Sequence, residues 1–89
     1  MILNFKKSFA RDLKKRKTDK PLLDRVRQII KEVEEAQDIN GIRNLKKLKA
    51  QGNHYRIRMG DYRLGLVIEE DTVCFVRFLH RGEVYTYFP

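Results

Sequence analysis

Residues 55–63 read YRIRMGDYR, a stretch that predicts two antiparallel strands joined by a tight turn. Gly60-Asp61 is the expected two-residue loop, because glycine adopts the positive φ that the primed hairpin turns require. With that loop, Arg58 lies opposite Arg63 in the neighbouring strand. Side chains along a strand alternate between its two faces, so this pairing gives the hairpin one apolar face and one basic face.

The two faces of the hairpin differ in chemistry. The expected core face consists of Tyr55, Ile57, Met59, Tyr62, Leu64 and Leu66. The other face carries His54, Arg56, Arg58 and Arg63, and Gly65 leaves an open space among the guanidinium groups. Like charges directly across a strand pair destabilise it by about 0.2–1 kcal/mol, so folding alone gives no reason to place Arg58 against Arg63. A bound anion does, and the basic face is therefore the predicted binding face.

Length and composition predict one globular domain that spans residues 1–89. Hydrophobic residues make up 42% of the chain and charged residues 36%, which is typical of an ordered, soluble protein with one modest core. The net charge of +8 is concentrated in residues 1–20, with 8 basic and 2 acidic side chains, and in residues 42–63, with 7 and 1. This distribution indicates attraction to phosphate, nucleic acid or an acidic protein surface. For residues 1–20 the alternative is the solvated side of a helix.

The sequence disfavours metalloproteins, cofactor enzymes and membrane proteins. Two histidines, with no Cys or His pair at ligand spacing, predict no metal site, and the length leaves no room for a cofactor domain. The single cysteine, Cys74, cannot pair within the chain, which favours a reducing compartment and a buried core position. No apolar run has the length of a signal peptide or of a membrane span, about 18 residues, so we expect the chain in the cytoplasm.

Two amphipathic helices are predicted before the hairpin, after a short strand at residues 2–5. The first helix ends near Lys17, and Pro21 suits the first turn of the second, which places Arg25 on its outward side. The apolar stripes are Phe5, Phe9 and Leu13 on the first helix, and Leu22, Leu23, Val26, Ile29, Ile30 and Val33 on the second. Two such helices in a row predict a helix hairpin packed on a sheet.

Residues 42–53, between the helices and the hairpin, give a weaker pattern. Leu45 and Leu48 have helical spacing, with Lys46, Lys47 and Lys49 beside them. We interpret Lys46 and Lys47 as a solvated face that also attracts RNA electrostatically.

The third strand of the sheet is expected at residues 72–79, after an acidic turn. With Glu70-Asp71 as its loop, His80 falls opposite Asp61, at the rim of the basic face. The same register places Phe78 opposite Arg63 and Arg77 on the core side. The predicted architecture is α+β, in which a short N-terminal strand and a two-helix hairpin pack on a small antiparallel sheet in the order β-α-α-β-β-β.

This order, together with YRIRMGDYR at residues 55–63 and FLHRGEVY at residues 78–85, resembles the RelE/ParE superfamily of bacterial and archaeal toxins. The resemblance covers almost the whole chain. Its RelE-type branch implies an endoribonuclease that cuts messenger RNA in the ribosomal decoding site. Its ParE-type branch implies a poison of DNA gyrase.

The RelE-type pattern also implies roles for single residues. The implied catalytic residues are Arg56, Arg58, Arg63, Arg81 and Tyr85, and Lys49 matches a basic position that the family uses toward RNA. The chain departs from the pattern in three ways. Arginines replace lysines at positions 56 and 58, the segment 81–85 is shorter, and no C-terminal helix follows.

The chemistry of RNA cleavage without a metal suits these residue types. It needs a base for the 2′-hydroxyl, positive charge at the phosphorane and an acid for the leaving 5′-oxygen. Arginine is a poor base but a planar, bidentate phosphate clamp, which suits the arginines to transition-state stabilisation. Histidine changes charge nearest to neutral pH, so His80 is the best-placed acid or base and His54 the competing candidate. Tyr85 can transfer a proton or stack on a base. The structural alternatives are ion pairing for the arginines, an ordinary exposed position for His80 and packing for Tyr85.

The leading hypothesis is therefore the toxin of a toxin–antitoxin pair, a ribosome-dependent endoribonuclease that cleaves mRNA by metal-free attack of the 2′-hydroxyl. Its expected partners are mRNA on the ribosome and a cognate antitoxin, with no cofactor. The expected RNA-binding residues are Lys46, Lys47, Lys49 and His54. The alternatives are a DNA gyrase inhibitor and a catalytically silent basic module that binds RNA or an acidic protein.

Overall fold

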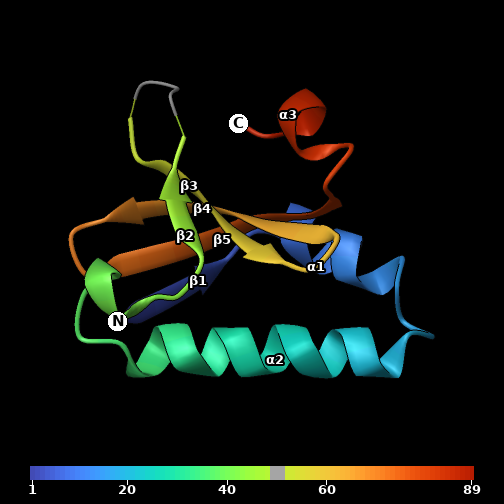
Figure 1. Ribbon diagram of the computed structural model, residues 1–89, viewed down its shortest axis with the longest axis horizontal. Helices are drawn as coiled ribbons and strands as arrows, with labels where there is room; N and C mark the ends of the chain where they lie inside the picture. The colour runs from blue at the N-terminus through green and yellow to red at the C-terminus, as the bar shows by residue number, and fades with distance from the viewer. Residues whose placement is uncertain (49–51) are drawn as a thin grey trace.

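The computed structural model describes residues 1–48 and 52–89. Its elements in chain order are β1 (Ile2–Phe5), α1 (Lys7–Lys14), α2 (Lys20–Glu35), the 3-10 helix η1 (Ile39–Gly41), β2 (Leu45–Lys47), β3 (His54–Met59), β4 (Tyr62–Glu69), β5 (Thr72–His80) and α3 (Val84–Tyr87) (Figure 1). The α+β class and the predicted order of strand, two helices and three-stranded meander are confirmed. The structure adds β2, in the weakly patterned segment, and α3, at the C-terminus.

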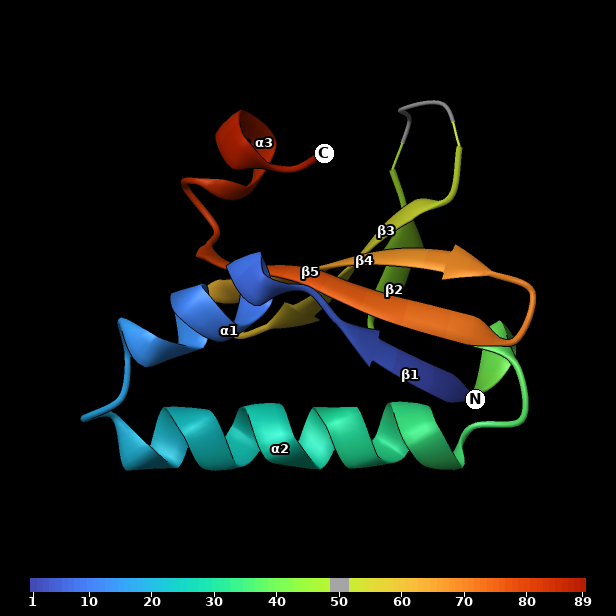
Figure 2. The ribbon, with the colours of Figure 1, turned by 180° about the vertical axis from the view of Figure 1, so that it is seen from behind.

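The strands form one five-stranded sheet in the order β1-β5-β4-β3-β2. The sheet is mixed rather than antiparallel throughout, because β1 pairs in parallel with β5 and the other pairs are antiparallel. The helices that follow β1 carry the chain along one face of the sheet before β2 begins at the opposite edge (Figure 2). In β2, Leu45 pairs with Ile57 and Lys46 with Arg56. Three residues that alternate in this way are too few for a sequence pattern to separate them from a helix.

The main core lies between the helices and one face of the sheet. Side chains from α1 and α2 meet those of β3, β4 and β5, and the largest fully buried ones are Phe9, Phe75, Ile57, Leu64, Leu66, Val26, Val33 and Val73. The predicted core face of the hairpin is confirmed, with Tyr55 and Tyr62 partly buried beside this core. The Asp19 carboxylate accepts a hydrogen bond from the Leu22 N–H at 3.2 Å and starts α2, as expected of an N-cap with Pro21 in the first turn.

An ion pair between buried Asp12 and half-buried Arg77 fastens α1 to β5. The Asp12 carboxylate accepts hydrogen bonds from Arg77 Nε at 2.7 Å and Nη2 at 3.1 Å, and from the Phe78 N–H at 2.9 Å. Asp12 is only 5% exposed, so these hydrogen bonds take the place of water around its carboxylate. Removing one partner of such a pair leaves the other without a counter-charge and is strongly destabilising, so this contact holds α1 in position on β5.

The β3–β4 hairpin has the predicted register. Arg58 pairs with Arg63 and Met59 with Tyr62, and Gly60 has φ +59° in the turn. The β4–β5 register differs from the prediction, because a bulge lies at Gly65/Leu66. One extra residue in a strand moves every later side chain to the opposite face.

The bulge corrects three predicted positions. His80 pairs with Tyr62 rather than facing Asp61, and Leu79 rather than Phe78 pairs with Arg63. Arg77 pairs with Gly65, so it shares the sheet face of Arg56 instead of the core side. The bulge does not affect Cys74, which keeps its predicted pairing with Val67; this cysteine is only half-buried, so its predicted core position was wrong.

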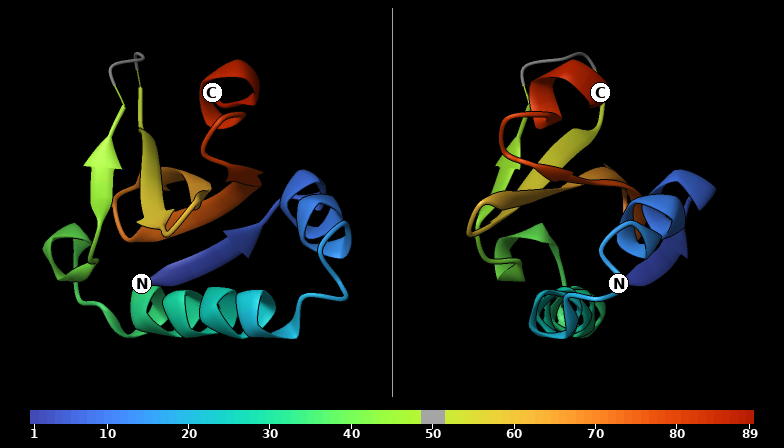
Figure 3. Two further views of the ribbon diagram at one scale, coloured as in Figure 1. Left: turned by 45° about the vertical axis from the view of Figure 1, so that its right-hand side comes forward. Right: turned by 90° about the vertical axis from the view of Figure 1, so that its right-hand side faces the viewer.

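A second apolar cluster covers the sheet face away from α2, where α3 and the C-terminus lie (Figure 3). Its buried members are Leu48, Leu79, Val84 and Phe88. The expectation of a chain without a C-terminal helix was therefore wrong: Val84 and Phe88, four residues apart, anchor one helical turn to the sheet. A β-carbon built on Gly65 would lie 2.8 Å from the Phe88 ring, so this ring occupies the space that was expected to stay open for an anion.

Within residues 1–48 and 52–89, no helix combines the length and the apolar character needed to cross a lipid bilayer.

Candidate active site

Three arginines and one tyrosine lie near enough to Arg63 to act on its charge. We call Arg56, Arg58, Arg63 and Arg81 the arginine cluster. The pKa of Arg63 lies below its ordinary value, first because of partial burial, then because of the positive charges of Arg56 and Arg58, with a smaller effect of Arg81. Tyr85 acts in the opposite direction and favours the charged form of Arg63. The structure thus brings together five of the six predicted catalytic residues.

Backbone groups of the turn hold two members of the arginine cluster. Arg63 Nη1 donates hydrogen bonds to the carbonyl oxygens of Gly60 and Tyr62, both at 2.8 Å. The Arg81 N–H donates to the Asp61 carbonyl oxygen at 2.7 Å, and its Nε lies 3.9 Å from the Asp61 carboxylate. That ion pair is exposed and contributes little stability, but the backbone bond fixes residue 81 beside the hairpin. Ion pairing with stray carboxylates therefore does not account for Arg63.

Arg56 and Arg58 differ in their surroundings. Arg58 is exposed, whereas Arg56 is half-buried between Lys46 of β2 and Gly65 of β4. Within the described part of the chain, Arg56 Nε is a buried atom without a hydrogen-bond partner. A buried donor left unpaired costs about 1–3 kcal/mol, which an acceptor oxygen from a ligand would offset.

Tyr85 projects from α3 into solvent and is 73% exposed. Its neighbours Val84 and Phe88 are buried in the second apolar cluster, so they carry the packing role and Tyr85 does not. The packing alternative for Tyr85 is therefore wrong.

The two histidines lie apart from each other. His80 stands against the Tyr62 ring, with centroids 5.5 Å apart and the planes nearly perpendicular, and its Nδ1 accepts a hydrogen bond from the Gly82 N–H at 3.3 Å. Because Tyr62 stacks on Phe78 of the main core, His80 belongs to the helix-facing side and not to the rim of the basic face. His54 is on the basic face, where its ring lies edge-on to Phe88 at 5.5 Å.

The predicted RNA-binding lysines also separate. Lys46 pairs with Arg56 and shares its face of the sheet, while Lys47 lies with its ammonium 6.0 Å from the centre of the Tyr55 ring. Lys49 is outside the described residues.

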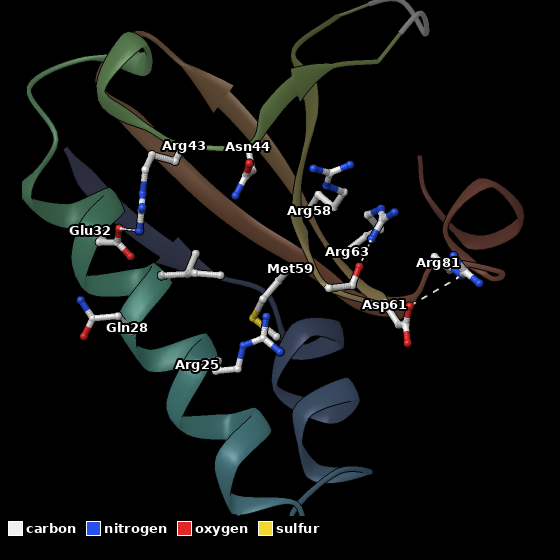
Figure 4. A pocket seen from close by; sticks show the side chains of 12 residues that line it. Arg25, Gln28, Glu32, Arg43, Asn44, Arg58, Met59, Asp61, Arg63 and Arg81 are labelled. Carbon is white, nitrogen blue, oxygen red and sulfur yellow. Dashed lines mark hydrogen bonds and ion pairs between the residues drawn. The ribbon is translucent and has the colours of Figure 1, made fainter.

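An open groove of about 630 Å³ borders the arginine cluster on the side of α2 (Figure 4). Its walls are Arg25, Gln28, Ile29 and Glu32 of α2, Arg43 and Asn44 before β2, and Arg58, Met59, Gly60, Asp61, Arg63 and Arg81. Arg25 and Arg43 were not among the predicted site residues, and Arg25 was expected to point outward. The helical spacing from Leu22 to Arg25 and from Arg25 to Ile29 could have shown that Arg25 flanks the buried stripe.

No three side chains of His, Cys, Asp and Glu gather as ligands for a metal ion within residues 1–48 and 52–89.

A family model described as the ParE toxin of the type II toxin–antitoxin system parDE matches residues 3–85. The chain belongs to the RelE/ParE toxin family. This toxin is 40% identical over 90 residues to Toxin RelE3 of Methanocaldococcus jannaschii, and the match covers 100% of both chains.

Solved structures agree with this membership. The crystal structure of the RelB-RelE antitoxin–toxin complex from Methanococcus jannaschii matches the toxin with a TM-score of 0.78 and 38% identity, over 97% of this chain and 99% of that one. The toxin–antitoxin complex RelBE2 from Mycobacterium tuberculosis matches with a TM-score of 0.59 and 26% identity, over 90% and 96%. The predicted resemblance is confirmed. The family model carries the name of the ParE branch and the curated relative that of the RelE branch, so these names do not decide between the two activities. The residues of the site carry that distinction.

Proposed function

We propose that this toxin is a ribosome-dependent endoribonuclease that cleaves mRNA with the RNA's own 2′-hydroxyl as nucleophile. The observation that carries the proposal is the placement of Arg58 directly across from Arg63, with Arg56 and Arg81 near enough to disfavour the charge on Arg63. Such repulsion destabilises the free protein. A phosphate, and still more a phosphorane with its additional charge, would relieve it.

In this mechanism the 2′-oxygen attacks the adjacent phosphorus while the bond from phosphorus to the 5′-oxygen breaks. The 2′-hydroxyl loses its proton as it attacks and the leaving 5′-oxygen takes up a proton from solvent, so the products are a 2′,3′-cyclic phosphate and a 5′-hydroxyl. Arg58 and Arg63 clamp the non-bridging oxygens, and Arg56 and Arg81 add positive charge as negative charge develops. The guanidinium groups thus supply the charge that a metal ion supplies in other nucleases.

Proton transfer is assigned to Tyr85 in preference to the histidines. Tyr85 is exposed beside the arginine cluster, whereas His80 lies on the other face of the sheet and His54 lies against Phe88. The phenolic oxygen of Tyr85 is the group beside the arginine cluster that can take up the proton of the 2′-hydroxyl. Because Tyr85 is the single proton-transfer group assigned here, the toxin depends on the ribosome to align the 2′-oxygen for in-line attack. The toxin therefore acts in the cytoplasm, where translation takes place.

End-group analysis of mRNA cleaved on ribosomes by the purified toxin tests the proposal. We expect 2′,3′-cyclic phosphate and 5′-hydroxyl ends, and no cleavage at a site that carries a 2′-deoxy substitution. With a free RNA that does not need intact ribosomes, slow cleavage should continue in EDTA. A 5′-phosphate end, or cleavage at the deoxy site, would rule the mechanism out.

The second candidate function is inhibition of DNA gyrase, which the name of the matching family model favours. Absence of any cleavage on ribosomes, together with loss of gyrase supercoiling activity in the presence of the toxin, would establish that reading. Absence of both effects would leave a basic binding module.

A cognate antitoxin is the proposed protein partner, since two of the similar structures are toxin–antitoxin complexes. We expect an amphipathic, partly acidic segment of that antitoxin to cover or displace part of the basic face, because an uncovered surface of this charge binds nucleic acid indiscriminately. Raising the salt concentration should therefore weaken the complex, as measured by calorimetry. A salt-insensitive complex in which Arg56, Arg58 and Arg63 stay open to solvent would contradict this expectation.

A further inference from the structure

We propose that the groove between α2 and the β3–β4 turn binds a second phosphate of the RNA strand, with Arg25 as the residue that contacts it. The inference rests on the proposed function and extends it to the path of the substrate beyond the scissile bond. The groove shares Arg58, Arg63 and Arg81 with the arginine cluster, so a strand whose scissile phosphate lies in the cluster has its neighbouring phosphates at the mouth of the groove (Figure 4).

The position of Arg25 is the first reason for this assignment. A β-carbon built on Gly60 would lie 3.4 Å from a terminal nitrogen of Arg25 and 3.5 Å from the other, so the guanidinium group lies against the hairpin turn. Helix α2 thereby places the Arg25 cation beside the turn that holds Arg63 and Arg81. Arg25 is about 35 residues or more away from these turn residues in sequence.

The charge balance of the groove is the second reason. Its walls contain five arginines and two carboxylates. Both carboxylates already have partners: Glu32 lies 2.6 Å from Arg43, and Asp61 lies 3.9 Å from Arg81. Among residues 1–48 and 52–89, no carboxylate forms an ion pair with Arg25 or Arg58. The groove therefore has an excess of three positive charges and two guanidinium groups ready to bind an anion.

The lining favours a nucleic acid strand over a protein helix. An amphipathic helix needs a hydrophobic groove, and Ile29 and Met59 are the only larger apolar side chains in this one. The volume lies within the range of about 300–1,000 Å³ that holds ligands of nucleotide size. Arg25 as a point contact to phosphate would add affinity without sequence preference.

A matched pair of substitutions on one helix tests the site. Arg27 is also an exposed arginine of α2, but it pairs with Asp24 at 2.8 Å and does not line the groove. Arg25→Gln and Arg27→Gln remove the same charge from the same helix, so any difference between them reports the groove and not the net charge. Equal thermal unfolding temperatures of the two variants would confirm that both fold.

The measurement is the affinity for a short single-stranded RNA made uncleavable by 2′-O-methyl groups, at several salt concentrations. Arg25→Gln should weaken binding about three- to tenfold, and reduce the slope of log K against log salt by about 0.7, the value for one phosphate contact on a single strand. Arg27→Gln should leave both nearly unchanged. On ribosomes, Arg25→Gln should raise KM while kcat stays the same, because the contact is made equally in the ground state and the transition state.

Three results would overturn the inference: wild-type affinity and slope in Arg25→Gln, an equal loss in both variants, or a loss of antitoxin binding alone. The binding measurement needs no catalysis. If the toxin did not cleave RNA but Arg25→Gln still reduced the slope of log K against log salt, the proposed reaction would be refuted and the phosphate site would be supported.

Discussion

Replacing Arg63 by alanine should lower the rate of mRNA cleavage by about a hundredfold to a thousandfold, and should abolish growth inhibition, while the toxin still folds. Arg63 lies opposite Arg58 and is held by two carbonyl oxygens of the turn, so its remaining donors are fixed in direction. Removing one preorganised donor from a phosphorane site costs about 2.7–4 kcal/mol of transition-state stabilisation. The side chain lies on the face away from the main core, so the free energy of unfolding should change little.

Two further variants separate the loss of charge from the loss of the turn contacts. Arg63→Gln keeps a donor for the Gly60 carbonyl oxygen but removes the cation, and should be as inactive as the alanine variant. Arg27→Ala removes an arginine of α2 that lies outside the site, and should retain activity. Single-turnover cleavage on ribosomes and growth curves after induction measure the effect. Full toxicity of a folded Arg63→Ala variant would refute the active-site assignment.

Replacing Phe88 by alanine, which removes its contact with Gly65, should have the next largest effect on cleavage. Phe88 is 3% exposed, and truncating a buried phenylalanine to alanine costs about 3–5 kcal/mol. Because α3 packs on the sheet through the second apolar cluster, this loss should detach the C-terminal turn and leave the main core intact. Tyr85, which sits on that turn, would lose its place beside Arg63, and cleavage should fall by about a hundredfold, the value of one proton-transfer group.

Substitutions at two glycines test this idea without touching Phe88. A β-carbon at Gly65 would lie 2.8 Å from the Phe88 ring, whereas one at Gly82 would lie 3.7 Å from His80 Nδ1, an ordinary contact. Gly65→Ala should therefore increase hydrogen exchange at the amides of Tyr87 and Phe88, which donate to Glu83 and Val84, and should reduce cleavage. Gly82→Ala should change neither. Protected amides and normal cleavage in Gly65→Ala would show that Phe88 does not position Tyr85.

Much of the site follows from the sequence by local rules. The glycine in the turn fixes the loop of the hairpin, and the loop fixes the register, so the opposition of Arg58 and Arg63 could be read directly from residues 55–63. The apolar stripe of α2 likewise predicts the face that it buries. These features depend on residues that are close in sequence, where periodicity and turn chemistry decide the conformation.

Other features needed the tertiary structure, because they depend on packing between distant residues. The bulge at Gly65/Leu66 lets β5 pair with β4 and also meet Asp12 of α1 through Arg77, and it moves His80 to the opposite face. Phe88 fills the space beside Gly65, and Arg25 reaches the turn from another element. The sequence by itself determined the fold class, the hairpin register and the chemical character of the basic face. Only the tertiary structure decided that Tyr85 rather than His80 lies near the arginines and that Arg25 lies against the turn, because a shift of one residue in a strand changes the face of a side chain without changing its local pattern.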